Sequence, residues 1–118
     1  MRYMLLVYLD EQALDETERE ECYVESVQLT HELNSSGHYL DAAPLHPTST
    51  ATSVRVREGK RLVTDGPFAE SREQFAGYVS VECATDERAA EIAARWPDVR
   101  YGGAIEIRAI LADSGAEA

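Results

Sequence analysis

The residues best suited to chemistry lie in one short segment near the middle of the chain, Thr64–Glu70. Its Asp65-Gly66-Pro67 sequence is typical of a tight turn, because glycine tolerates unusual backbone angles and proline fixes its own. A carboxylate held where a strand passes into a loop could transfer protons to and from a substrate. Asp65 could instead only cap the turn, by accepting hydrogen bonds from backbone amides. On spacing alone, the structural role is the commoner one.

Histidine is the other candidate for proton transfer, because its ordinary pKa lies near neutrality. His46 lies on an expected loop between two prolines and is a candidate general base. His31 lies at the margin of the apolar face of an expected helix and ranks after His46 as a candidate catalytic residue. The alternative for His46 is a surface histidine without a role or one that packs on Pro47, and for His31 a residue at the helix margin that hydrogen-bonds to the sheet edge. His38 is expected only to interact with the carboxyl end of that helix.

Four residues near Asp65 could contact a substrate. Arg72 could bind an anionic group, since guanidinium geometry suits carboxylates. Tyr78 could donate a hydrogen bond from a strand, and Phe68 and Glu70 belong to the same turn segment as Asp65. The alternatives are a solvated ion pair of little energetic weight for the charged residues and core packing for the tyrosine.

The sequence indicates neither a metal site nor a cofactor. The three histidines have no paired spacing, and Cys22 and Cys83 lie far apart. No glycine-rich pattern typical of nucleotide binding is present. Both cysteines are expected to be reduced core residues, and neither has a base beside it in sequence that would make it a nucleophile.

The length and net charge of the chain limit the number of domains and the kinds of partner that we expect. A chain of 118 residues suits one domain with one core. The net charge of −11 should repel nucleic acid and anionic membranes, whereas a basic protein partner is compatible with it. No apolar run approaches the ~18 residues that a membrane span needs. Residues 1–7 are expected to form a strand and not a signal peptide, which predicts a cytoplasmic protein.

The elements expected to position these residues follow the order strand, helix, strand, hairpin, strand, helix, strand. The first helix is predicted over 17–36, from a capping box at Thr17–Glu20 to a stop at Gly37. The second follows Thr85 and ends at Pro97. Strands are predicted at 2–9, 38–42, 77–83 and 104–111, the hairpin at 51–64, and a loop or helical turn at 71–76.

Two helices on one face of an antiparallel sheet predict an α+β fold. The order βαββαβ with an inserted β-hairpin is that of a ferredoxin-like two-layer sandwich. The face of the sheet without helices must be covered, and a second copy of the chain is the simplest cover, so we predict a symmetric homodimer. The single domain is expected to span 1–111, followed by a flexible acidic tail at 112–118.

Three segments carry a resemblance to a known family, at 45–55, 65–78 and 96–108. The middle one is the most specific, with Asp65-Gly66-Pro67-Phe68-Ala69-Glu70 followed by Gly77-Tyr78. From Met1 to about Ile110 the chain resembles the YCII-related proteins, in the branch whose signature is DGPF. The resemblance implies a ferredoxin-like fold of the dimeric α/β-barrel type and identifies Asp65 as the signature aspartate. Arg72 stands where the branch usually has lysine.

The resemblance leaves two hypotheses for function. The family's characteristic histidine and aspartate suggest an enzyme. On this first hypothesis Asp65, with His46, His31 or Arg72, acts as a cofactor-independent isomerase or lyase on a small polar or ring-shaped metabolite in a dimer cleft. Members of the branch also occur near, or fused to, sigma factors. The second hypothesis is therefore a non-catalytic ligand-binding or regulatory module linked to sigma-factor-dependent transcription.

Overall fold

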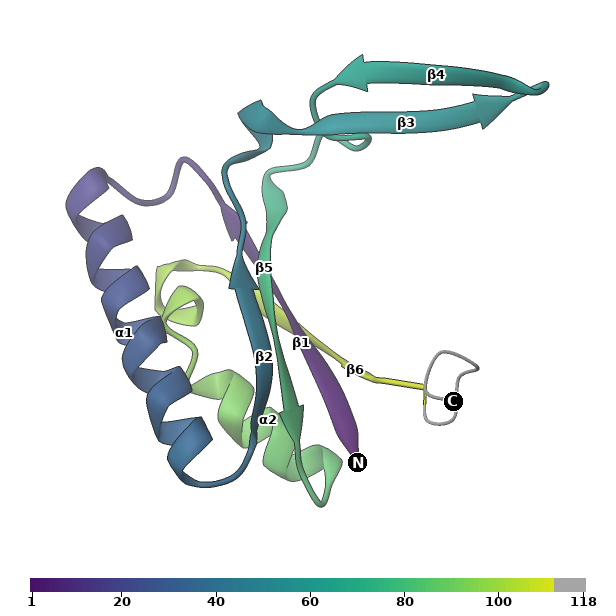
Figure 1. Cartoon of the computed structure of the whole chain (residues 1–118). Helices are drawn as coiled ribbons and strands as arrows, with labels where there is room; N and C mark the ends of the chain where they lie inside the picture. Colours follow the sequence, from purple (N-terminus) through teal and green to yellow (C-terminus); the bar gives the residue numbers. More distant parts are fainter. Residues whose placement is uncertain (112–118) are drawn as a thin grey trace.

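The chain folds as a four-stranded antiparallel sheet covered on one face by two helices (Figure 1). The computed structural model describes residues 1–111, so the tail predicted at 112–118 lies outside the described residues. The elements in order are β1 (Arg2–Asp10), α1 (Glu16–Ser35), β2 (Tyr39–Pro44), η1 (Thr48–Thr50), β3 (Thr52–Arg57), β4 (Lys60–Asp65), β5 (Glu73–Glu82), α2 (Asp86–Ala94), η2 (Pro97–Tyr101) and β6 (Ala104–Ala109).

The sheet has the strand order β2-β5-β1-β6, and each neighbouring pair is antiparallel. This order places the first and third strands of the βαββαβ sequence at the centre, where they are buried most deeply. The arrangement confirms an α+β fold and is compatible with the predicted ferredoxin-like sandwich. No helix within residues 1–111 has the length and apolar character needed to cross a membrane.

The N-cap of helix α1 lies two residues earlier in the sequence than predicted. Asp15, and not Thr17, is the N-cap: its carboxylate accepts from the Glu18 N–H at 2.8 Å, and the Glu18 carboxylate accepts from the Asp15 N–H at 3.0 Å. Both Asp15–Glu18 and Thr17–Glu20 have capping-box spacing, so spacing alone did not separate them. The helix ends as predicted, just before Gly37, whose φ of 81° favours glycine.

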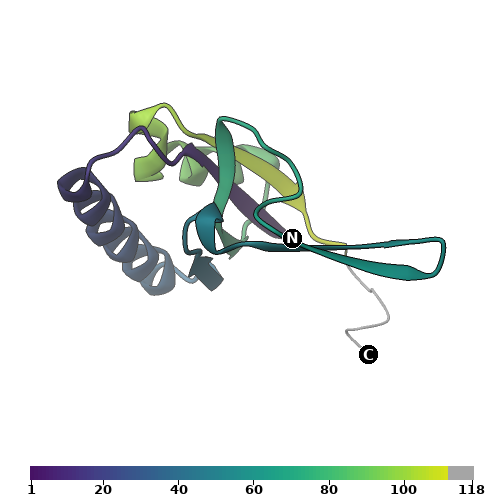
Figure 2. The same cartoon turned by 90° about the horizontal axis from the view of Figure 1, so that it is seen from above.

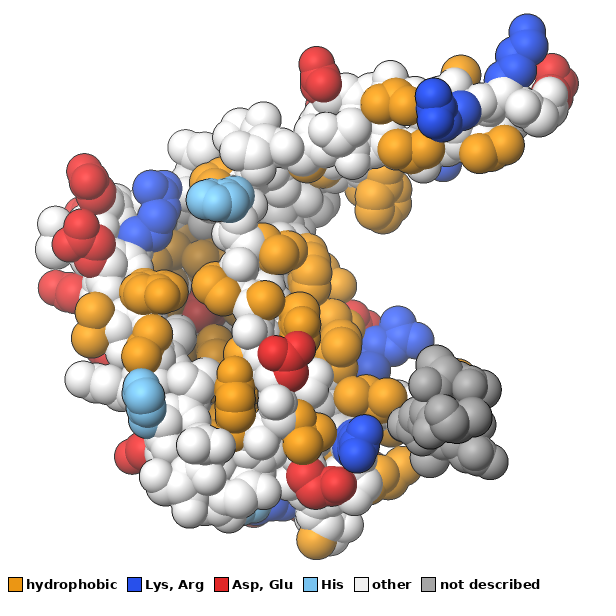
Figure 3. All heavy atoms as spheres, viewed as in Figure 1, with side chains coloured by type: hydrophobic (Ala, Val, Ile, Leu, Met, Phe, Trp, Pro, Cys, Tyr) orange, Lys and Arg blue, Asp and Glu red, His pale blue; other side chains and the backbone are white. Residues whose placement is uncertain are grey.

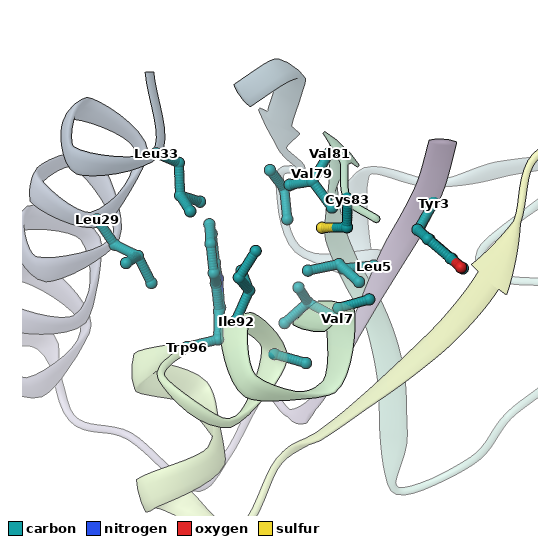
Figure 4. Packing of buried hydrophobic residues seen from close by; sticks show 12 residues of the cluster. Tyr3, Leu5, Val7, Leu29, Leu33, Val79, Val81, Cys83, Ile92 and Trp96 are labelled. Carbon is teal, nitrogen blue, oxygen red and sulfur yellow. The ribbon is translucent and has the colours of Figure 1, made fainter. Parts of the chain in front are cut away.

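The core lies between the two helices and the inner face of the sheet (Figure 4). Leu5, Val79 and Ile92 are fully buried, and each such side chain stabilises the fold by about 1.5–3 kcal/mol. Trp96, just after α2, lies between Ile92 and the leucines of α1. The indole ring therefore packs the segment after α2 against the first helix.

Strand β5 is longer than predicted, and the expected loop or helical turn at 71–76 is wrong from Glu73 onward. Strand β1 continues to Asp10 and pairs with Glu73, so tertiary pairing overrides the weak local signal. The register shifts between Val7 and Tyr8, because Ala76 is an extra residue on β5. This bulge turns Phe75 to the outer face of the sheet, where its ring lies 5.7 Å from that of Tyr8.

The inserted hairpin forms a separate two-stranded sheet, which we call the β3–β4 arm (residues 52–65). Its turn at Glu58-Gly59 has positive φ at both positions, 51° and 76°, as tight hairpins require. In Figures 1 and 2 the arm projects away from the helices, on the side of the sheet that the helices leave open. The inserted hairpin predicted from the sequence is confirmed.

Candidate functional site

A cavity of about 740 Å³ opens between α1 and the inner face of the sheet, visible as a hollow in Figure 3. Its sheet side is lined by small residues, Ala42, Ala76 and Gly77, which leave space below the helix. The helix contributes a row of polar residues at four-residue spacing, Cys22, Ser26 and Thr30. Residues 45–49, which form the loop after β2 and the start of η1, also line the cavity. An apolar cavity of this size with a few polar groups is typical of small-molecule sites.

A buried carboxyl group and a buried thiol form the polar centre of the cavity. The Cys22 thiol donates to Asp98 Oδ1 at 3.4 Å, and both residues are more than nine-tenths buried. Burial raises the pKa of Asp98, and the hydrogen bond from Cys22 offsets part of that rise. Burial, followed by the nearby Asp98 charge, raises the pKa of Cys22 to about 12. At neutral pH the thiol is therefore a proton-bearing donor and not a nucleophile.

Asp98 is positioned by the end of α2 and the turn after it. Pro97 begins η2, and the Gly103 N–H donates to the Asp98 main-chain carbonyl at 3.0 Å. A Cβ at Gly103 would come within 2.8 Å of that carbonyl oxygen, so glycine permits this close approach. The Asp98 backbone is thus fixed while its side chain reaches the thiol on α1.

Charged residues surround the mouth of the cavity. Arg19 Nη2 donates to the main-chain carbonyls of Glu11 and Leu14, at 3.1 and 3.3 Å. Within residues 1–111 Arg19 forms no ion pair with a carboxylate. The Glu11 carboxylate accepts both the N–H and the hydroxyl of Thr48, at 2.8 and 2.5 Å, and so ties the loop before α1 to η1. His46 is exposed and also lines the cavity.

The predicted catalytic residues do not come together. Asp65 ends β4 opposite Thr52, is exposed, and does not line the cavity, although Gly66 and Pro67 beside it do. His46 lines the cavity, whereas His31 borders a separate shallow hollow near the carboxyl end of α1. Within the described part of the chain, no hydrogen bond reaches the Asp65 carboxylate; Gly66 holds the turn through Ala51 and Ser53.

Of the four predicted substrate-binding residues, only Tyr78 borders the cavity, but its register opposite Leu6 puts its side chain on the outer face of the sheet. Its hydroxyl donates to Asp41 Oδ2 at 2.8 Å, and this hydrogen bond raises the pKa of Tyr78. Phe68 is 79% exposed, and Glu70 and Arg72 are exposed on the same loop. The roles assigned to these residues stay predictions.

The sequence analysis missed Asp98, Arg19 and the polar row on α1. Cys22 was assigned only to the core, where it does lie. A signal was present, because Cys22, Ser26 and Thr30 recur every four residues among apolar neighbours, and polar residues on a buried helix face need a reason. In residues 1–111 no group of three or more His, Cys, Asp or Glu side chains is placed to hold a metal ion.

Comparison with known proteins places this chain in a family. The family model described as the YCII-related domain matches residues 1–112. The chain belongs to the YCII-related domain family. This YCII-related protein is also 32% identical, over 96 residues, to an uncharacterized protein from Rhizobium meliloti strain 1021, covering 79% of this chain and 77% of the relative. The family resemblance noted in the sequence is confirmed, and the named relative brings no activity with it.

The raised pKa of Asp98 predicts a pH effect on the stability of this YCII-related protein. The folded state binds the Asp98 proton more tightly than the unfolded state, so this contribution is complete below the unfolded pKa of about 3.9 and is lost as pH rises through the folded pKa. The Asp98→Asn variant has no carboxyl group to ionise at this position, so its stability does not fall in this way as pH rises. We expect the variant to be more stable than wild type at pH 7 and the difference to shrink towards pH 4.

Urea denaturation at several pH values, followed by circular dichroism, measures this effect. Glu20→Gln, an exposed carboxylate on α1, is the control and should leave the pH slope of stability unchanged. Equal pH slopes for wild type and Asp98→Asn would show that Asp98 is solvated in the native protein.

Proposed function

We propose that the cavity binds a small molecule with an apolar, ring-sized body and an anionic group, and that the protein performs acid–base chemistry on it without a cofactor. The observation that carries the proposal is Asp98, a buried carboxyl group with a raised pKa that lines a cavity of about 740 Å³. Perturbed carboxyl groups inside cavities are candidates for proton transfer. The reaction class is that of an isomerase or lyase.

Asp98 takes the role that the sequence assigned to Asp65. Its carboxylate removes a proton from a carbon of the substrate, leaving the electron pair on the substrate. The same carboxyl then returns the proton to a neighbouring atom in an isomerisation, or to a leaving group in an elimination. The Cys22 thiol, which stays protonated at neutral pH, donates to one Asp98 oxygen and orients the other.

Arg19 defines the class of substrate. Among the described residues that line the cavity, it is the one Lys or Arg, and its guanidinium contacts only neutral carbonyl groups. A carboxylate on the ligand would supply the anionic partner that Arg19 lacks, with paired hydrogen bonds. His46 lies on the same mouth and can stabilise charge that develops on the substrate. The ligand thus enters with its body inward and its anionic group at the rim.

Proton exchange tests the proposal without knowledge of the natural substrate. Arylacetates and ring-bearing keto acids are incubated in deuterated water, and NMR follows replacement of the hydrogen beside the carbonyl by deuterium. We expect wild type to catalyse exchange in at least one of them and Asp98→Asn to slow it by about 10²- to 10⁴-fold, the usual contribution of a positioned acid or base. Asp65→Asn should retain wild-type rates.

Matched variants separate binding from proton transfer. Arg19→Gln should raise the ligand concentration needed for half-maximal exchange, and should do so for the acid and not for its neutral amide. Arg95→Gln, an exposed arginine outside the cavity, is the control. Loss of exchange in Asp65→Asn with full activity in Asp98→Asn would overturn the assignment and restore Asp65 as the catalytic residue.

The second candidate function is a non-catalytic ligand-binding or regulatory module that docks a basic segment of a sigma factor. Two observations favour it. Asp65, the signature residue, is exposed and lies outside the cavity. The body of the protein is strongly acidic, since residues outside the arm hold twenty of the twenty-two Asp and Glu residues. Binding of acids in the cavity without any proton exchange would support this module over the enzyme.

A further inference from the structure

The β3–β4 arm has an apolar face that nothing in the described chain covers. In its register Val54 lies directly opposite Val63, and Val56 lies two residues along on the same face, opposite Arg61. These three valines are 59%, 57% and 70% exposed. A two-stranded hairpin is at best marginally stable in water, and its unpaired edges invite another chain. An exposed arm of this kind indicates a contact surface.

The opposite face of the arm is cationic. Arg55 lies on it beside Leu62, and Arg57 lies opposite Lys60 at the tip. Residues 52–65 hold four of the eleven Lys and Arg residues but only two of the twenty-two Asp and Glu residues. The arm is therefore basic in a protein whose net charge is −11. The body of another copy of the same chain has the opposite charge to the arm, which draws the two together.

The outer face of the main sheet offers the matching surface. An apolar patch on it is formed by Leu6, Tyr8 and Phe75. Leu6 and Tyr8 alternate with the core residues of β1, and the bulge places Phe75 opposite Tyr8. Asp41 and Glu106 lie on the same face, where they accept hydrogen bonds from tyrosine hydroxyls. Figures 1 and 2 show the arm projecting on this side of the sheet, past its edge. A subunit bound on the outer face would therefore meet the arm.

We propose that the arm is an exchanged clasp: in a symmetric pair, each subunit lays its arm on the body of the other. The valine face packs on apolar surface of the partner copy, and Arg61, which lies on that face opposite Val56, meets the carboxylates of the partner copy. The twofold symmetry forms each contact twice, so a weak hairpin becomes part of a closed interface. This proposal is independent of the chemistry assigned to the cavity.

The first experiment measures the dimer directly. Sedimentation equilibrium of the full chain should show a dimer, and Val54→Asp combined with Val63→Asp should raise its dissociation constant at least tenfold, since two charges would be buried. Val24→Asp, a valine on α1 that is 52% exposed, is the matched control and should leave the dissociation constant unchanged. Thermal unfolding verifies that each variant is folded.

The second experiment identifies what the arm contacts. Arg61→Glu should weaken the dimer at least tenfold at low salt, and mixing this variant with Asp41→Lys/Glu106→Lys should restore association as a heterodimer. Wild type that stays monomeric at 100 μM (about the upper working range of the method), or a valine variant that dimerises as tightly as wild type, would overturn the proposal. In the monomeric case the arm belongs to a different partner.

Discussion

Replacing Trp96 with alanine is expected to lower the free energy of unfolding by about 3–5 kcal/mol, as removal of a buried aromatic side chain does. The indole lies between Ile92 of α2 and the leucines Leu29 and Leu33 of α1, and only 7% of it is exposed (Figure 4). Native domains are stable by about 5–15 kcal/mol, so this loss would remove a large part of the total. Trp96 also lines the cavity, so the space it leaves joins the cavity.

Urea denaturation followed by circular dichroism measures this loss, because Trp96 is the single tryptophan and its fluorescence disappears with it. Trp96→Phe is the matched variant: it keeps an aromatic ring between the helices and should cost clearly less. A loss below about 1 kcal/mol for alanine, typical of a surface substitution, would show that α1 is held to the sheet by other contacts.

Replacing Gly77 with alanine is the second change with a large expected effect. Its φ of 156° is one that side-chain-bearing residues rarely adopt, and a Cβ there would lie 2.7 Å from the main-chain oxygen of Ala43 and 3.0 Å from Pro44 Cα. Backbone strain costs about 1–3 kcal/mol, and overpacking against backbone costs about as much again. Strand β2 would have to move away from β5, which disturbs the sheet side of the cavity.

Gly37→Ala is the control for Gly77→Ala. Gly37 also has positive φ, 81°, but a Cβ there would meet nothing within 4 Å. Gly37→Ala should therefore lower the free energy of unfolding only through backbone strain, by about 1 kcal/mol. Thermal and urea unfolding of both variants should show a clearly larger loss for Gly77→Ala. Equal losses would mean that β2 shifts at little cost and that the close contact with Ala43 is not a constraint.

The fold was largely predictable because its signals are local. The Glu58-Gly59 turn, the glycine after α1 and the hydroxyl of Thr85 each act within a few residues, and each predicted helix and strand exists. One error was local, since Asp15 and not Thr17 caps α1. The other arose where a distant partner decides the outcome. Strand β5 extends to Glu73 only because β1 offers Asp10 as a partner more than sixty residues away.

The candidate site was less predictable for the same reason. Asp98 and Cys22 are separated by 76 residues, and nothing in the local pattern around either shows that they meet. Spacing within the DGPF segment directed attention to Asp65, whose neighbours Gly66 and Pro67 reach the cavity while its own side chain stays outside. The turn of this segment therefore lies at the cavity, whereas the carboxylate of Asp65 lies outside it.

The bulge on β5 has a consequence for how the family can vary. Side chains on a strand alternate between faces, so the extra residue Ala76 reverses which residues before Gly77 point inward. With the bulge, a methyl group faces the cavity and the Phe75 ring faces outward. Deleting Ala76 would restore simple alternation with Phe75 still opposite Tyr8 on the outer face, and it would remove the methyl group that faces the cavity. Pairing Tyr8 with Ala76 without a bulge would instead turn the Phe75 ring into the cavity. A one-residue length change here would thus alter the wall of the cavity while Phe75 and Gly77 keep the faces of the sheet that they have now.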